Sequence, residues 1–392
     1  MDINGDGKPD ILCCSGGCMG YAEADWKHPD APWTFHAATP KGPWQRFTHG
    51  LGAGDISGDG RVDILDKDGW WEQPKSLASN PVWKHHAYSF GGGQGGAQML
   101  VYDVNGDGLN DVITSINAHG YGLAWYQQVR NGDEITFQQH MILNTSPAPD
   151  RYGVSFSQIH SLALADIDGD GLLDIVTGKR FWAHGTHGDV AAGDPPYLYW
   201  FQLQRPSKGP NSFPAEFVPH RIDDDSGVGT QVVAGKISNK KFPDIVVGNK
   251  KGLFLLQHQT KRVSRKQWLD AQPKPVEDSG DGNGRGKEAE RAPATDAKAT
   301  AGSASLPRRL QDNGATALSS EGSLPLGRDG KPLNLDFEDG TLKDWTTTGE
   351  AFEKQPIRGD TVFPRRSDMR SEHQGNYWIG GFEIAGTNRR AR

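Results

Sequence analysis

The stretch DVNGDGLNDVITS, residues 103–115, decides how this chain folds. In its first nine residues, acids and an amide stand at alternate positions with two glycines between them, and a β-branched apolar run follows at once. Alternate oxygen-bearing side chains can converge on one cation, the glycines permit a tight turn, and the apolar run has the composition of a strand. The stretch therefore predicts an acidic turn that leads directly into a β-strand.

The same stretch recurs along the chain. Its copies are DINGDGKPD at 2–10, DISGDGRVD at 55–63 and DIDGDGLLD at 166–174, with a degenerate copy, KISNKKFPD, at 236–244. The copies begin 48 to 70 residues apart, and repeats of about 40 to 50 residues are typical of propellers and arrays. Met1 stands directly before a turn in the middle of a unit. We therefore expect a fragment whose first strand, and any export signal, lie upstream.

Each copy belongs to a longer unit. An apolar stretch follows the turn, an aromatic stretch such as GWWEQ (69–73) comes next, and an aromatic residue three positions before a histidine closes the unit. These histidines are His36, His86, His140 and His220. Four short strands per unit without helical periodicity predict an all-β fold of propeller blades, about five of them visible. The repeated histidines are expected to be architectural, and the aromatic pairs to form core between blades.

The acidic turns carry the oxygen ligands that calcium prefers. Calcium binds about six to eight oxygens, and side chains at positions 1, 3, 5 and 9 with the main-chain carbonyl at position 7 would supply them. We predict about four structural calcium sites; the alternative is an acidic turn that binds no metal. The predicted ligands are Asp2, Asn4, Asp6, Lys8, Asp10, Asp55, Ser57, Asp59, Arg61, Asp63, Asp103, Asn105, Asp107, Leu109, Asp111, Asp166, Asp168, Asp170, Leu172 and Asp174. The fifth copy has Lys236 at position 1 and is not expected to bind calcium.

At this spacing the turns resemble those of FG-GAP or VCBS repeat β-propellers of the integrin-α type, over residues 1–260. In that family the turn joins the first and second strands of a blade and holds calcium on one face, mainly as a structural element. The resemblance implies a partial calcium-loop β-propeller that acts as a binding or scaffold module. It also implies an extracellular, periplasmic or cell-surface location.

The opposite face of such a propeller gathers the residues at the start of each first strand and the loops after each second strand. The predicted ligand face contains His49, Gln98, Asn117, His119, Arg180, Trp182 and Gln231. Four further residues are candidates for a second metal site or for acid–base catalysis: His160, His184, His187 and Asp189. The alternative is that they bond loop carbonyls and line a wet channel. Their spacing matches no established zinc motif, which favours the alternative.

The ligand of such a module would be a protein or a carbohydrate. The sequence shows no complete catalytic constellation, so a binding module is favoured over an enzyme. The rival hypothesis is a metal-assisted sugar lyase similar to the aldos-2-ulose dehydratases, which carry a propeller of similar type. The net charge of −7 without a long basic run argues against nucleic-acid binding, and no apolar stretch is long enough to span a membrane.

The remainder of the chain differs in composition. Residues 261–330 are charged and small, which predicts a disordered linker, with a short helix at 264–271 that would cap the propeller. Residues 331–392 resume a strand pattern, and DFEDGTLKDW and GNYWIGGFE are similar to the start of carbohydrate-binding jelly rolls. We expect an incomplete jelly-roll-like β-sandwich there. Cys13, Cys14 and Cys18 would form one local disulfide with a thiol left over, or stay free.

Overall fold

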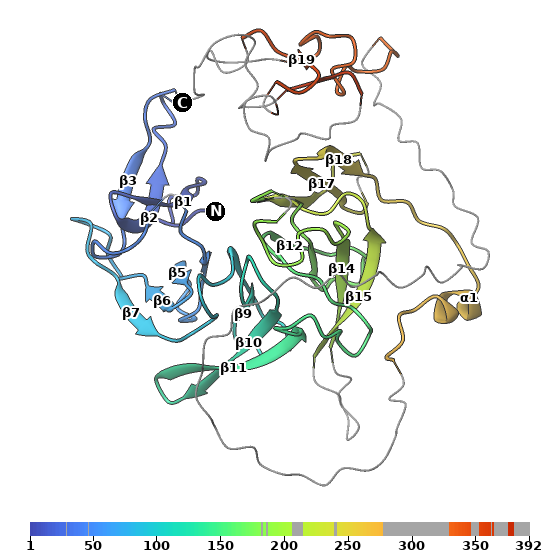
Figure 1. Ribbon diagram of the computed structural model, residues 1–392. Helices are drawn as coiled ribbons and strands as arrows, with labels where there is room; N and C mark the ends of the chain where they lie inside the picture. The colour runs from blue at the N-terminus through green and yellow to red at the C-terminus, as the bar shows by residue number, and fades with distance from the viewer. Residues whose placement is uncertain are drawn as a thin grey trace, which may run out of the picture.

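The computed structural model describes residues 1–276, apart from 29, 46, 182, 186, 206–214 and 239–240, together with 329–345, 353–361, 363 and 375–379. Small sheets follow one another in an open arc that keeps the order of the chain (Figure 1). Among the described residues, the only helix is the six-residue α1. The fold is all-β and consistent with a partial β-propeller, as the repeats predicted.

Five blades correspond to the five turns. Blade 1 contains β1 (Ile11–Ser15), β2 (Cys18–Glu23) and β3 (Thr34–Ala37), and blade 2 contains β4 (Leu51–Gly54), β5 (Asp63–Asp66), β6 (Gly69–Glu72) and β7 (Lys84–Ala87). Blade 3 contains β8 (Gln98–Tyr102), β9 (Asp111–Ser115), β10 (Leu123–Asn131) and β11 (Glu134–Leu143). Blade 4 contains β12 (Leu162–Ala165), β13 (Asp174–Gly178), β14 (Leu198–Gln204) and β15 (Glu216–Asp223). Blade 5 contains β16 (Val232–Gly235), β17 (Asp244–Asn249) and β18 (Gly252–Leu256).

The expectation of four strands per unit is correct for blades 2, 3 and 4. For blade 1 a first strand was not expected within this sequence, and for blade 5 the expectation is wrong in the described residues. In the described residues blades 1 and 5 have three strands each. The sheet of blade 1 begins with β1, which directly follows the first acidic turn. After β18 the chain continues towards α1, and residues 257–263 lack the aromatic-to-histidine pattern that marks the fourth strand in the other blades.

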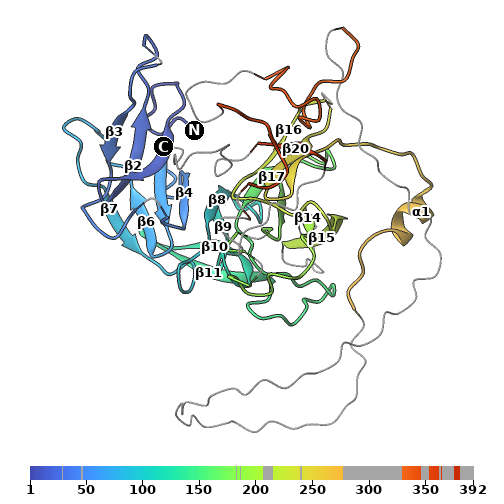
Figure 2. The same ribbon diagram turned by 45° about the horizontal axis from the view of Figure 1, so that its top comes forward.

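The first strands of the blades line the inside of the arc. Strands β4 and β8 pair in parallel through Leu51 with Gln98 and Gly52 with Met99, which joins blades 2 and 3 into one eight-stranded sheet (Figure 2). A Cβ atom at Gly52 would lie 2.4 Å from the carbonyl oxygen of Met99. The small residues of the LGAG strand are therefore required for the inner strands to approach one another.

Aromatic side chains fill the space between blades. Trp70, Tyr126 and Phe201 are almost fully buried, as expected for residues of the core between blades. Each outer-strand histidine stacks on an aromatic ring of the neighbouring strand, which agrees with the architectural role predicted for it. The ring pairs are Tyr21–His36, Trp70–His86, Trp125–His140 and Trp200–His220, with centroids 4.0–4.9 Å apart.

The predicted short helix is present as α1 (Arg265–Asp270), begun by a capping box between Ser264 and Gln267. None of its residues is buried, so it does not cap the propeller. The segment after α1 does contact the blades, because the amide of Val276 donates to the carbonyl of Arg151 at 2.7 Å. The predicted disordered linker lies largely outside the described residues.

In the C-terminal segment the described strands are β19 (Ile357–Arg358) and β20 (Tyr377–Trp378), which pair with each other. The jelly-roll resemblance stays a prediction. Near the other end of the chain, Cys13, Cys14 and Cys18 are free thiols on β1 and β2. None of the helices in the described part of the chain is long and apolar enough to cross a bilayer.

One stacked histidine gives a pH-dependent stability. Burial lowers the pKa of His220 to about 4, and its Nε2 has no hydrogen-bond partner. Between pH 6.5 and 4 the unfolded chain therefore takes up a proton that the folded chain does not, so stability falls as the pH falls. We expect His220→Phe, which keeps a stacked ring, to remove up to about 2 kcal/mol of this loss. Urea unfolding at pH 7 and pH 4.5 measures it, with His28→Ala as a surface control; equal losses in the wild type and His220→Phe would contradict the assignment.

Candidate functional site

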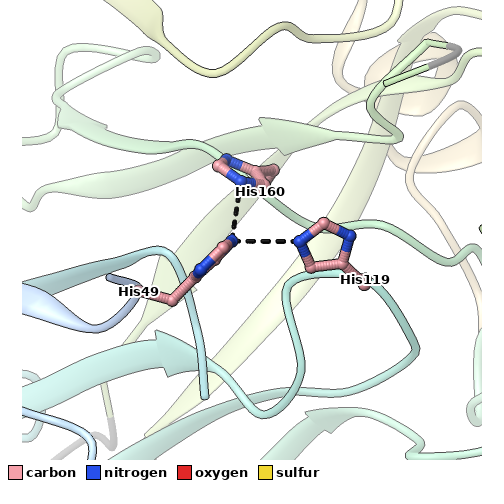
Figure 3. A group of neighbouring side chains, drawn as sticks. All are labelled: His49, His119 and His160. Atoms are coloured by element: carbon pink, nitrogen blue, oxygen red, sulfur yellow. Dashed lines mark hydrogen bonds between the residues drawn. The ribbon is translucent and has the colours of Figure 1, made fainter. Parts of the chain in front are cut away.

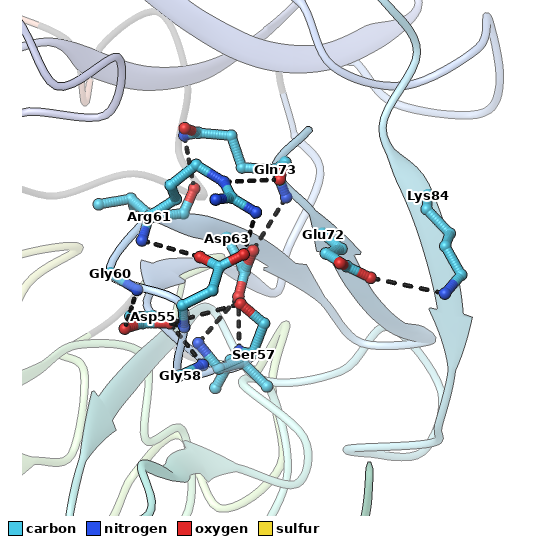
Figure 4. A network of polar contacts seen from close by, with 12 residues as sticks. Asp55, Ser57, Gly58, Gly60, Arg61, Asp63, Glu72, Gln73 and Lys84 are labelled. Atoms are coloured by element: carbon cyan, nitrogen blue, oxygen red, sulfur yellow. Dashed lines mark hydrogen bonds and ion pairs between the residues drawn. The ribbon is translucent and has the colours of Figure 1, made fainter. Parts of the chain in front are cut away.

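The acidic turns of blades 2, 3 and 4 join the first and second strands of their blades, and the turn of blade 1 leads into β1. In the second turn, Asp55 accepts hydrogen bonds from the amides of Gly58 and Gly60 (Figure 4). Both glycines have left-handed φ angles, 77° and 83°. Residues other than glycine rarely adopt this backbone conformation, which explains why the two glycines recur in each acidic copy of the motif.

The ninth-position aspartate of each turn has a role that the sequence analysis missed. Asp63 is fully buried, and it accepts hydrogen bonds from the amides of Ile56, Ser57 and Gln73 at 2.8–2.9 Å (Figure 4). Its carboxylate thus ties the start of the turn to the end of the third strand. Burial raises its pKa to about 6, although the three amide donors oppose that shift.

The same aspartate bridges the turn and third strand in the later blades. Asp111, Asp174 and Asp244 are also fully buried and make equivalent bonds, to the amides of Gln128, Leu203 and His258 on the strand side. Asp244 belongs to the degenerate fifth copy. The one acid that this copy keeps is therefore the one that bonds the turn to the chain at the end of the third strand.

The remaining acids of the turns are half-buried at the first position and exposed at the third and fifth positions, and they suit calcium. Carboxylate oxygens of Asp166, Asp168 and Asp170 lie within 4.8 Å of one another, and an all-oxygen set is what a hard cation selects. In the second turn the guanidinium of Arg61 pairs with Asp59 instead, so a cation there would have to displace it. The residues present fit calcium, and its binding remains a prediction.

The opposite face brings together residues from several blades. The side-chain amide of Gln98 donates to Gln231 at 2.8 Å, and the Gln98 side-chain carbonyl accepts the amide of Leu162 at 2.6 Å. These residues stand at or next to the starts of β8, β16 and β12. The face predicted from strand direction is therefore formed, and side chains of different blades meet on it.

Three histidines converge at the centre of this face. The Nε2 atom of His49 lies 3.2 Å from Nε2 of His160 and 3.0 Å from Nε2 of His119 (Figure 3). His49 and His160 precede β4 and β12, while His119 lies in the loop between β9 and β10. We call these three residues the histidine cluster. Neighbouring loops hold it in place.

The loop of His119 is held by two short bonds. The side-chain oxygen of Asn117 accepts the amide of His119 at 3.0 Å, and the carbonyl of Gly120 accepts the amide of Gln158 at 2.7 Å. Gln158 is fully buried and has a left-handed φ of 61°. A non-glycine residue in that conformation marks local strain, which is found most often at functional sites.

Asp189 stands behind the cluster. Its Oδ1 atom lies 2.9 Å from Nδ1 of His119 and 2.9 Å from Nδ1 of His184, and the guanidinium of Arg180 is 4.0 Å from Oδ2. The side chain of Asp189 is 3% exposed. Burial raises its pKa, but the hydrogen bonds from His184 and His119 outweigh this, so the pKa is below its usual value.

Burial disfavours the charged forms of several basic groups on this face. Burial, with Arg180 and the other imidazoles, lowers the pKa of His160 to about 3. Burial also lowers the pKa of Arg180 to about 10 and that of Lys179 to about 8. Lys179, which the sequence analysis missed, is 1% exposed and donates to Ser157 at 3.1 Å. Several potential donors and acceptors here have no partner, including Nδ1 of His160, Nε of Arg180 and the side-chain oxygen of Gln158.

The structure revises which candidates act together. His160 meets His49 and His119, and Asp189 meets His184, but His187 is exposed and lies outside every group of potential ligands among the described residues. Trp182 lies outside the described residues. In the 184–189 segment, His184 and Asp189 form a second group of potential ligands with His119, so a metal or acid–base site there stays a prediction.

Comparisons with known proteins identify the repeats. Residues 2–65 and 103–177 match the family model described as FG-GAP-like repeat, so the blades in these segments are FG-GAP-like repeats, as the turns indicated. A search of curated proteins finds no match. One similar solved structure is described as the structural basis of specific recognition of non-reducing terminal N-acetylglucosamine by an Agrocybe aegerita lectin. That similarity has 15% identity and a TM-score of 0.35, and it spans 63% of this chain and 58% of the lectin chain.

The two kinds of aspartate in a turn can be separated by mutation. With calcium removed by chelator, we expect Asp111→Ala to cost about 2–4 kcal/mol, because two buried amides lose their acceptor. The exposed Asp107→Ala should cost less than about 1 kcal/mol under the same conditions. Urea unfolding measures both variants. Equal losses would show that the ninth-position carboxylate does not hold the blade.

Proposed function

We propose that this chain is the calcium-stabilised propeller part of a secreted or cell-surface binding protein. Its ligand, a protein or a carbohydrate, binds on the face that carries the histidine cluster. The observation that carries this proposal is the convergence of polar side chains from blades 2, 3, 4 and 5 on that face, opposite the acidic turns. The FG-GAP-like repeats support it, because loops on a rigid repeat scaffold commonly carry binding function.

The chemistry of the face favours a polar ligand. Imidazole, amide and guanidinium groups offer hydrogen-bond donors and acceptors together, and Arg180 and Lys179 add positive charge. Such groups suit hydroxyl and carboxylate groups of a sugar or of an acidic protein loop. Buried polar groups without partners gain most from a ligand that supplies them.

Calcium is proposed as a structural component of the acidic turns. Calcium that binds only the folded chain stabilises it by mass action, by about 2.7 kcal/mol per site at a hundredfold excess over the dissociation constant. Extracellular turns of this kind need only millimolar calcium, which fits the proposed location.

The stability of the full chain should therefore depend on calcium. We expect about four calcium ions per chain and a melting temperature clearly higher in millimolar calcium than in chelator. Asp166→Ala should lower the number of bound ions by one, since it removes the first ligand of the fourth turn. Calorimetry and metal analysis after dialysis measure these quantities. A melting temperature that is the same in calcium and in chelator would show that the turns are acidic loops that bind no metal.

Ligand binding can be tested with His184→Ala. The His184 side chain is 56% exposed, so its loss should leave the fold intact. We expect glycan-array or protein-array signals of the wild type to weaken at least about tenfold in this variant. Lys84→Ala, on the outer strand β7, is the matched control and should bind normally. Signals that are lost equally in both variants, or kept in both, would show that the ligand does not bind on this face.

The second candidate function is a metal-assisted sugar lyase. The pair of His184 and Asp189 beside the histidine cluster favours it, because an imidazole hydrogen-bonded to a carboxylate can transfer protons. Mass spectrometry of the ligand after incubation separates the two functions. A binding module returns the ligand unchanged, whereas a lyase returns a product that has lost water or another leaving group.

A further inference from the structure

In the histidine cluster two ring nitrogen atoms contact each other, and it is not evident which of them donates a hydrogen. Nε2 of His49 and Nε2 of His119 are 3.0 Å apart, which is hydrogen-bond distance. A hydrogen bond needs one donor and one acceptor, and a neutral imidazole carries a proton on only one of its two nitrogens. The partners of the Nδ1 atoms therefore decide whether this contact can be a hydrogen bond.

Both Nδ1 atoms face acceptors. Nδ1 of His49 lies 2.9 Å from the carbonyl oxygen of Phe47, so it carries the proton of that ring. Nδ1 of His119 lies 2.9 Å from the carboxylate of Asp189 and 3.2 Å from a guanidinium nitrogen of Arg180. An ionised carboxylate can only accept, so the shorter contact requires the proton on Nδ1 of His119, and Arg180 directs its hydrogens elsewhere.

In these tautomers both Nε2 atoms present lone pairs to each other. Two lone pairs at 3.0 Å repel unless a positive species lies between them. Nε2 of His160 faces the same point, and its Nδ1 has no partner that would fix its tautomer. We propose that the Nε2 atoms of His49, His119 and His160 bind one transition-metal ion of the zinc class.

The geometry of the three rings fits such an ion. Zinc binds imidazole nitrogen at about 2.0–2.1 Å, which places nitrogens of a tetrahedral site about 3.3 Å apart. The Nε2 atom of His49 lies 3.0 Å and 3.2 Å from those of His119 and His160, which is close to this separation. The ring planes are inclined by 62°, 72° and 86° to one another, so the rings surround a common point instead of stacking (Figure 3). Three protein ligands leave a fourth position open to water or to a ligand.

Asp189 completes the arrangement as a positioning residue. A metal-bound histidine usually donates its other N–H to a carboxylate or a carbonyl, which fixes the ring and raises its basicity. His119 donates to Asp189 and His49 to the carbonyl of Phe47 in this manner. Asp189 also lies 4.0 Å from Arg180, so its charge offsets the cation nearest to the site.

This site is chemically distinct from the acidic turns. Neutral imidazoles select zinc, copper or nickel over calcium, whereas carboxylates and carbonyls select calcium. A saturating concentration of calcium should therefore leave the histidine cluster open to zinc. The site does not depend on what ligand the face binds, so zinc binding and ligand binding can fail separately.

The test is a titration of the full chain with zinc in millimolar calcium, monitored by isothermal titration calorimetry. We expect one zinc ion per chain, with an affinity that His49→Gln and His119→Gln each lower at least about a hundredfold. Asp189→Asn should lower it about 10- to 100-fold, as loss of a carboxylate behind a ligand does. Cobalt(II) in place of zinc should give the visible absorption of a four-coordinate nitrogen site, and His119→Gln should abolish it.

The controls separate this site from general binding by histidines and from loss of the fold. His187→Gln removes an exposed histidine of the same face and should bind zinc as the wild type does. Calcium-dependent melting of each variant shows that it is folded. The proposal is overturned by any of three results: no stoichiometric zinc in the wild type, zinc that calcium displaces, or an equal loss of affinity in His187→Gln and His119→Gln.

Discussion

The fold depends on a buried carboxylate that joins two parts of each blade. In blades 2 to 5 the ninth-position aspartate accepts amides at the start of the acidic turn and at the end of the third strand. A buried charge is costly unless hydrogen bonds compensate it, and here two or more backbone donors do so. The degenerate fifth turn keeps only this acid and still makes the bridging bonds, so these bonds do not require the other acids of the turn.

These bonds fix which residues share a face. Because the turn lies at one end of the first strand, the residues before that strand lie at the other end, close to the same residues of neighbouring blades. The small side chains of β4 allow it to pair with β8, so the inner strands come close together. His49 and His160 thus meet across the inside of the arc although 111 residues separate them.

The sequence predicts what local chemistry dictates. The periodic turns, the strands after them and the stacked histidines such as His86 follow from residue type and spacing, and the structure agrees with them. The predicted ligand face also contained His49 and His119. Their convergence with His160 could not be predicted, because it depends on the angle between blades and on a strained residue, Gln158, that no spacing reveals.

Other differences have equally local causes. His187 was grouped with His184 because both lie in one loop, but the loop turns only His184 towards Asp189. The ninth-position aspartates were assigned to calcium from the motif, and burial shows their second role. Sequence spacing gives the order of such residues, whereas side-chain direction is set by contacts from other blades.

The most direct measurement is a crystal structure of the full chain grown with calcium and zinc, with anomalous diffraction recorded on both sides of the zinc absorption edge. The account predicts one zinc peak bonded to Nε2 of His49, His119 and His160, and calcium confined to the acidic turns on the opposite face. Zinc found only in the acidic turns, with the three imidazoles apart, would contradict it.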